Sequence, residues 1–158
     1  MARQPRWAAQ LFAGRDLDAI VDAVRDAERR TAAEIRVHIE RRVAHGLRDR
    51  PHDDALARAR EVFVALRMHE TALRAGVLIY LAVEDHKLAI VGDDGIHARV
   101  GESYWQQIRD RMVEQLRAGA ARAAVVQAVA EVGAVLAREF PRRPDDVDEL
   151  PNEVSLGP

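Results

Sequence analysis

One stretch of the sequence, residues 76–95 (GVLIYLAVEDHKLAIVGDDG), constrains the fold most because it predicts two consecutive strands. Residues 77–83 are nearly continuously apolar, which is typical of a strand covered on both faces of its sheet. A short polar link leads into a second apolar run at residues 88–91, so the pair predicts a β-hairpin. The second run stops at a Gly-Asp-Asp-Gly loop, residues 92–95. A small acidic loop at the end of a buried strand can hold a cation or a phosphate.

Apolar periodicity predicts a further strand and several helices around this hairpin. Residues 34–40 alternate between apolar and polar side chains, which predicts a strand with one well-buried face near a sheet edge. The helices predicted from three- and four-residue spacings lie at residues 16–31, 53–68, 103–119 (capped by Ser103) and 120–140, with a helical turn at 95–100. Gly133, inside the last helix, is expected to permit a close helix–sheet contact.

The order of these elements predicts the fold class. A helix between the first two strands favours a parallel pair joined by a right-handed crossover, and the hairpin makes the third strand antiparallel. The prediction is an α/β protein: a three-layer α/β/α sandwich around a small mixed sheet. Residues 1–15 are predicted to be an N-terminal extension and residues 16–140 the domain. Residues 141–158, rich in proline and acidic side chains, are expected to be an extended arm or a disordered end.

Composition excludes several classes of function. The chain has no cysteine, so disulfides, thiolate nucleophiles and cysteine-ligated zinc are excluded. A net charge of −2 gives no electrostatic reason to expect nucleic acid or an anionic membrane as a partner. The apolar patch at residues 7–13 is too short for a signal peptide, and no stretch predicts membrane insertion. We therefore expect a cytoplasmic protein.

The predicted topology brings several charged residues to one end of the sheet. Parallel first and second strands place their N-terminal ends together, and the antiparallel third strand delivers its C-terminal end to the same place. Glu34, Asp93 and Asp94 are thus candidate ligands for calcium or magnesium, which prefer oxygen ligands. Arg74, and His97 after the acidic loop, are candidates for binding a phosphate or another anion. The alternative is that Asp-Asp-Gly serves only as turn and capping chemistry.

No catalytic residue can be assigned from the sequence. The chain has two serines, Ser103 and Ser155, and no serine–histidine–acid arrangement is recognisable. Neither glycine-rich phosphate-loop pattern occurs. The six histidines are scattered and form no closely spaced metal-binding pair. Whether the chain is an enzyme is therefore left open.

Three blocks of the sequence, residues 31–37, 75–80 and 90–96, resemble the TPM domain in sequence and in mutual spacing. This family is named for a thylakoid-lumen phosphatase, a photosystem II accessory protein and a levamisole-receptor modulator. Residues 145–154 also resemble the ending of small stand-alone bacterial members.

The resemblance implies an α/β/α sandwich, divalent-cation binding in some members and acid phosphatase activity in the plant branch. The acidic candidates that it carries over are Glu34, Asp93 and Asp94. Many members have asparagine or aspartate–asparagine just before the glycine of the second strand, where this chain has Arg74-Ala75-Gly76, so one side chain that can bind a metal is missing. Most members also carry a signal peptide or a membrane anchor, and roles outside the cytoplasm are not transferred to this chain.

Two functional hypotheses follow. The first is an accessory or binding module that holds a divalent cation at Glu34, Asp93 and Asp94 and recruits a protein partner. The alternative is a weak metal-dependent acid phosphatase acting on phosphomonoesters, with Arg74 orienting the phosphate. Free sheet edges also leave room for self-association.

Overall fold

The structure is a computed structural model that describes residues 6–7, 12, 14–43, 54–71, 73–142 and 154–157. Most of the predicted N-terminal extension, and residues 143–153 of the predicted tail, lie outside the described residues.

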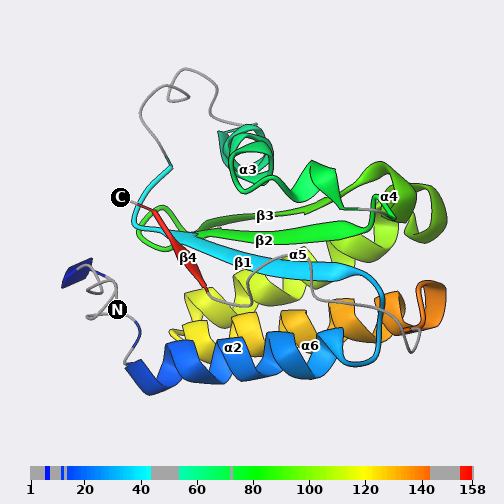
Figure 1. Ribbon diagram of the computed structural model, residues 1–158. Coiled ribbons are helices and arrows are strands. Elements are labelled where there is room, and N and C mark those ends of the chain that lie inside the picture. Colours follow the sequence, from blue (N-terminus) through cyan, green and yellow to red (C-terminus); the bar gives the residue numbers. More distant parts are fainter. Residues whose placement is uncertain are drawn as a thin grey trace.

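A four-stranded mixed sheet forms the middle layer (Figure 1). Its order is β3-β2-β1-β4, and the bounds are Glu34–Glu40 for β1, Gly76–Ala82 for β2, Lys87–Gly92 for β3 and Ser155–Leu156 for β4. β1 and β2 are parallel, with Glu34 opposite Gly76. β2 and β3 are antiparallel, with Val77 opposite Gly92. The parallel pair and the hairpin predicted from the sequence are thus confirmed.

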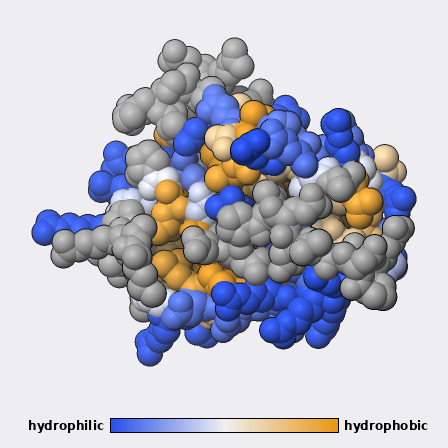
Figure 2. All heavy atoms as spheres, viewed as in Figure 1, coloured by the Kyte–Doolittle hydropathy of each residue, from blue (hydrophilic) through white to orange (hydrophobic). Residues whose placement is uncertain are grey.

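Helices cover both faces of this sheet (Figure 1). α2 (Gly14–Glu28), α5 (Glu102–Arg117) and α6 (Ala121–Glu139) cover one face, while α3 (Asp54–Ala65) covers the other. A short 3-10 helix, η2 (Met68–Glu70), precedes β2, and α4 (Asp94–Val100) follows β3 directly. The outer face of α2 is hydrophilic, as the lower part of Figure 2 shows. The predicted α/β/α layers are therefore confirmed.

The two cores of the molecule meet at β2, all of whose residues are buried. Because side chains alternate along a strand, Val77, Ile79 and Leu81 pack in the core shared with α2, α5 and α6. Leu78 and Tyr80 point to the opposite face and pack in the core shared with α3. The apolar run seen in the sequence reflects this burial on both faces.

Three local predictions need correction. β1 is buried on both faces rather than one: Glu34, His38 and Glu40, which alternate with its apolar side chains, are buried too, and Arg58 of α3 reaches Glu40. α5 begins at Glu102, preceded by Gly101 with a φ of 84°, so Ser103 lies inside the first turn and does not cap the helix. Gly133 permits a helix–helix contact rather than a helix–sheet contact, because a Cβ built on it would lie 2.7 Å from the Cβ of Ala27 in α2.

This close contact between α2 and α6 predicts the effect of enlarging Gly133. Gly133→Val is expected to lower the free energy of unfolding by about 1–3 kcal/mol, because overpacked helices must move apart. Urea unfolding followed by circular dichroism measures the change. Ala134→Val is the matched control, since Ala134 is the next residue of α6 and is exposed. Equal effects of the two substitutions would contradict the packing explanation.

Candidate functional site

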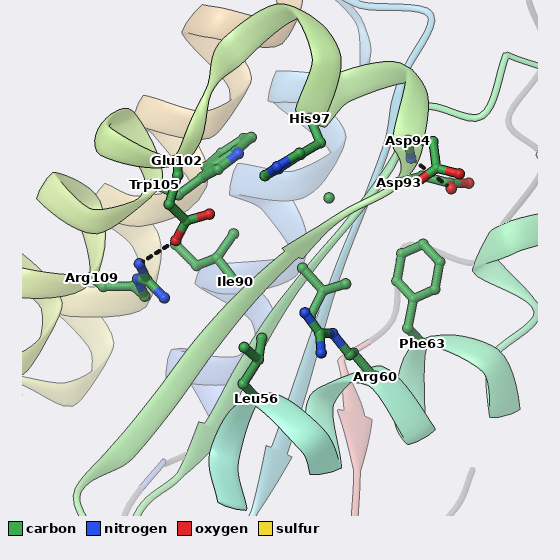
Figure 3. A pocket seen from close by; sticks show the side chains of 12 residues that line it. Leu56, Arg60, Phe63, Ile90, Asp93, Asp94, His97, Glu102, Trp105 and Arg109 are labelled. Atoms are coloured by element: carbon green, nitrogen blue, oxygen red, sulfur yellow. Dashed lines mark hydrogen bonds and ion pairs between the residues drawn. The ribbon is translucent and has the colours of Figure 1, made fainter. Parts of the chain in front are cut away.

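A cavity of about 340 Å³ lies along β3, which is the outermost strand on its side of the sheet among the described residues (Figure 3). α3 lines one side of it with Leu56, Arg60 and Phe63. The end of β3 and the following helices line the rest, with Ile90, Val91, Gly92, Asp93, Asp94, His97, Glu102, Trp105 and Arg109. The Gly-Asp-Asp-Gly loop therefore opens into a space with acidic, basic and aromatic walls.

Asp93 has one satisfied and one unsatisfied carboxylate oxygen. Its Oδ1 accepts a hydrogen bond of 2.8 Å from the backbone N–H of Asp94 and so caps α4. Its Oδ2 is buried and has no hydrogen-bond partner among the described residues. Asp93 as a whole is only 8% exposed. A buried carboxylate oxygen without a donor is costly, so this atom is suited to a cation or a hydrogen-bond donor.

The position of this loop depends on Gly95. A Cβ at Gly95 would lie 2.7 Å from the carbonyl oxygen of Arg74 and 2.9 Å from that of Leu73. Arg74 adopts a left-handed conformation, φ 52°, and its carbonyl accepts a hydrogen bond from the N–H of Gly95. The turn before β2 therefore contacts the loop after β3 through backbone atoms.

Basic and aromatic groups line the same cavity as the acidic loop. Arg60 and His97 are exposed. Arg109 is paired with Glu102 at 2.7 Å. Trp105 is 2% exposed, and its indole Nε1 has no hydrogen-bond partner among the described residues. Two residues that line the cavity, Asp93 and Trp105, thus each carry a buried polar atom without a hydrogen-bond partner among the described residues.

Of the predicted site residues, Asp93, Asp94 and His97 line this cavity, whereas Glu34 and Arg74 do not. Glu34 begins β1, and β2 lies between β1 and β3. Neighbouring strands are about 4.8 Å apart, which separates the backbone of Glu34 from β3 by roughly 10 Å. Within the described parts of the chain, no group of three or more histidine, aspartate or glutamate side chains is placed to hold a metal ion.

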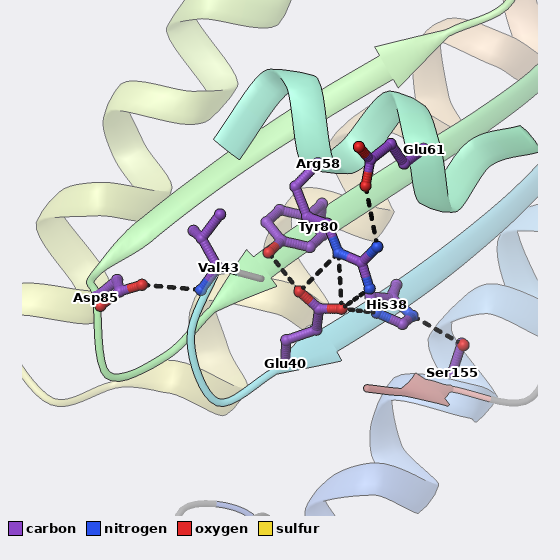
Figure 4. Close-up of polar contacts among 8 residues, drawn as sticks. All are labelled: His38, Glu40, Val43, Arg58, Glu61, Tyr80, Asp85 and Ser155. Carbon is purple, nitrogen blue, oxygen red and sulfur yellow. Dashed lines mark hydrogen bonds and ion pairs between the residues drawn. The ribbon is translucent and has the colours of Figure 1, made fainter. Parts of the chain in front are cut away.

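A second polar cluster lies on the α3 face of the sheet and centres on Glu40 (Figure 4). Glu40 is 1% exposed, and Tyr80 donates to its Oε2 at 2.6 Å. Arg58 of α3 binds its Oε1 through Nη2 at 2.5 Å, and the Nε2 of His38 lies 3.0 Å from the same oxygen. The Nδ1 of His38 is 2.8 Å from the Oγ of Ser155 in β4. A buried charge is thus held by three donors.

These contacts determine the ionisation of Glu40. Burial alone would raise its pKa, but the hydrogen bonds from His38, Arg58 and Tyr80 together lower the pKa from 4.5 to about 2. Burial and the same carboxylate raise the pKa of Tyr80 far above its usual value. The pKa of Arg58 is also raised, chiefly by its hydrogen bonds to Glu40. Glu40 is therefore an anion, and its partners remain donors.

Sequence reasoning missed both the basic wall of the cavity and the Glu40 cluster. No sequence pattern distinguishes Arg60 and Arg109, because arginines make up nearly all the basic residues of the chain. Glu40 lies on the polar face of the alternating strand, which was expected to be less buried. The one sequence feature that could have indicated the cluster is that Glu40 and His38 lie on the same face of the alternating strand.

The profile of the TPM domain matches residues 7–135 of the chain. The chain belongs to the TPM domain family. Its structure is similar to the NMR structure of the BA42 protein from the psychrophilic bacterium Bizionia argentinensis, with a TM-score of 0.81 and 40% sequence identity over 92% of this chain and 95% of that one. The N-terminal domain of the cg2496 protein from Corynebacterium glutamicum shares the fold, with a TM-score of 0.52 and 13% identity over 86% of each chain. No curated protein matches this TPM chain.

Within the described residues of this TPM domain, no helix is both long enough and apolar enough to cross a bilayer.

The lowered pKa of Glu40 predicts a pH-dependent contribution to stability. The ionised carboxylate stabilises the fold above pH 4.5, and this contribution is lost as the pH falls from 4.5 towards 2. At pH 7, Glu40→Gln is expected to lower the free energy of unfolding by about 3 kcal/mol, and the difference from wild type should shrink below pH 4.5. Urea unfolding at several pH values measures it.

Glu61→Gln is the matched control, because Glu61 pairs with the same Arg58 but its side chain is 54% exposed. Its effect should stay below about 1 kcal/mol at all pH values. A Glu40→Gln effect that does not change between pH 7 and pH 2 would show that ionisation of Glu40 contributes nothing.

Proposed function

We propose that this TPM domain is an accessory module that binds a divalent cation at Asp93 and Asp94 and recruits a protein partner. The observation that carries the cation site is the buried Oδ2 of Asp93, which has no partner among the described residues and belongs to a cavity-lining side chain. Asp94 supplies a second carboxylate at the same cavity. Oxygen atoms of this kind are the ligands that calcium and magnesium prefer.

The donor set fits a cation that retains much of its hydration shell. Two adjacent carboxylates are fewer than a closed calcium cage supplies, whereas magnesium is commonly bound through one or two carboxylates and several waters. Glu34 lies beyond β2, so the proposal rests on Asp93 and Asp94 alone. When bound, the cation would neutralise the buried charge of Asp93 and stabilise the start of α4.

Asp93→Asn tests this site with little disturbance of the fold, because asparagine also caps helices well. Isothermal titration with magnesium and with calcium should show binding to the wild type and at least a roughly tenfold loss of affinity in the variant. The cation should also raise the melting temperature of the wild type more than that of the variant. Asp110→Asn, the same change at an exposed position of α5, should bind like wild type. Absence of binding to the wild type would exclude the cation site.

A specific observation favours phosphomonoester hydrolysis as the alternative function. Arg60, Arg109 and His97 line the same cavity as the two aspartates. Guanidinium groups bind phosphate oxygens with two parallel hydrogen bonds. A bound cation would supply electrostatic stabilisation of the phosphoryl group. In this hypothesis, Arg60 replaces Arg74 as the group that orients the phosphate.

Hydrolysis of para-nitrophenyl phosphate, with and without magnesium, tests the alternative. Arg60→Gln should lower kcat/KM roughly tenfold or more, since it removes a charged hydrogen bond to the phosphate. Arg74→Gln, outside the cavity, should leave it unchanged. Activity that persists in the Asp93→Ala/Asp94→Ala double variant, or that depends on Arg74 and not on Arg60, would rule out this cavity as the site.

A further inference from the structure

The two edges of β1 are paired to different extents. Its inner edge pairs with β2 along the whole strand, from Glu34 to Glu40. Among the described residues, the outer edge pairs with β4 at two positions, His38 opposite Ser155 and Ile39 opposite Leu156. The outer edge of β1 is therefore a strand edge covered by a short segment from the far end of the chain, as Figure 1 shows.

Residues 154–157 occupy this edge through backbone and side-chain contacts. The N–H of Gly157 donates to the carbonyl of Ile39 at 2.8 Å. The Oγ of Ser155 lies 2.8 Å from the Nδ1 of His38. Val154 and Leu156 are partly buried and pack against the core shared with α2, α5 and α6. The segment thus alternates aliphatic and polar positions, as a strand with two different faces requires.

The last position of this segment selects glycine. A Cβ built on Gly157 would collide with the Cγ of Glu40 and lie 2.7 Å from its Oε1. A movement of Glu40 away from this Cβ would cost free energy, because its carboxylate is held by Arg58, Tyr80 and His38. The buried carboxylate of Glu40 therefore forms one fixed side of the edge site. It is held in place by residues outside residues 154–157.

The contacts of residues 154–157 are also few enough to be exchanged. All four residues are partly exposed, and the described ladder is two residues long. Short, partly exposed elements open at low free-energy cost compared with the core of a fold. When residues 154–157 dissociate, the outer edge of β1 keeps its conformation, since β1 remains paired with β2 and Glu40 remains bound to α3.

We propose that the outer edge of β1 at His38, Ile39 and Glu40 is a docking site for an extended peptide of a partner protein. The peptide is added parallel to β1 and carries the pattern aliphatic–Ser–aliphatic–Gly, which residues 154–157 display. Strand addition of this kind takes its affinity from backbone hydrogen bonds and its specificity from alternate side-chain positions. The chain's own segment is the internal occupant that such a partner displaces. This site is independent of the proposed cation site, which lies at the β3 edge.

Gly157→Val in the full-length chain tests the proposal, because the new side chain collides with Glu40 and vacates the edge. The probe is a fluorescein-labelled peptide with the sequence of residues 152–158, Asn-Glu-Val-Ser-Leu-Gly-Pro, followed by fluorescence anisotropy. The peptide should bind Gly157→Val at least roughly tenfold more tightly than wild type, since the tethered segment of the wild type competes at an effective concentration of order 1 mM. Amide shifts of His38 and Ile39 should report the same binding.

Gly14→Val is the matched control, since a Cβ there meets no described atom within 4 Å; this variant should behave like wild type. A peptide with valine at the glycine position should not bind. If Gly157→Val fails to fold, Leu156→Asp vacates the edge without touching Glu40 and should give the same result.

Three outcomes would overturn the proposal. The first is that the peptide does not bind either folded variant. The second is that peptides with and without the glycine bind equally well. The third is that the wild type forms a concentration-dependent dimer in light scattering while the peptide does not bind, which would assign the edge to a second copy of this chain.

Discussion

β2 pairs with β1 on one side and with β3 on the other, and this central position governs the arrangement of the surrounding layers. Every residue of β2 is buried, and its side chains alternate between two separate cores. A strand of this kind is stable only when helices cover both faces of its sheet. α3 must therefore lie on one face and the α2, α5 and α6 layer on the other, and their positions determine where every functional group lies.

The central pairing also leaves the sheet with two edges of different chemistry. At the β3 edge, Asp93 follows the strand and lines a cavity together with basic residues. At the β1 edge, a short segment ending in Gly157 covers the backbone beside a buried anion. α3 contributes to both places, because Arg60 lines the cavity and Arg58 binds Glu40. A displacement of α3 would alter both edges.

The Glu40 cluster is a costly way to stabilise a fold. A buried ion pair must recover the desolvation of both charges, and an apolar replacement is often equally stable. Here the carboxylate has hydrogen-bond donors from β1, β2 and α3, so breaking any one of them leaves a charge poorly compensated. The geometry of the cluster is consequently well defined. The fixed geometry of the Glu40 cluster aligns α3 with the sheet. The cluster also forms the surface that residues 154–157 contact.

The layers of the fold and the location of the acidic loop could both be predicted from the sequence, because both follow from local patterns. The apolar run of β2, the alternation of β1 and the Gly-Asp-Asp-Gly loop each report the environment of the chain over a few residues. The order of the elements then restricted the strands to the observed parallel and antiparallel pairing, and it brought Glu34 and Asp93 to the same end of the sheet.

Which charged groups lie near one another depends on how the helices pack on the sheet. Glu34 and Asp93 lie at one end of the sheet with β2 between them, and strand pairing alone does not say which side chains approach each other across β2. Arg60 reaches the cavity because α3 packs over the sheet, and Glu40 is buried for the same reason. The pairing of β4 with β1 joins segments more than a hundred residues apart. Such contacts depend on how elements pack, and the local periodicity of a sequence does not encode them.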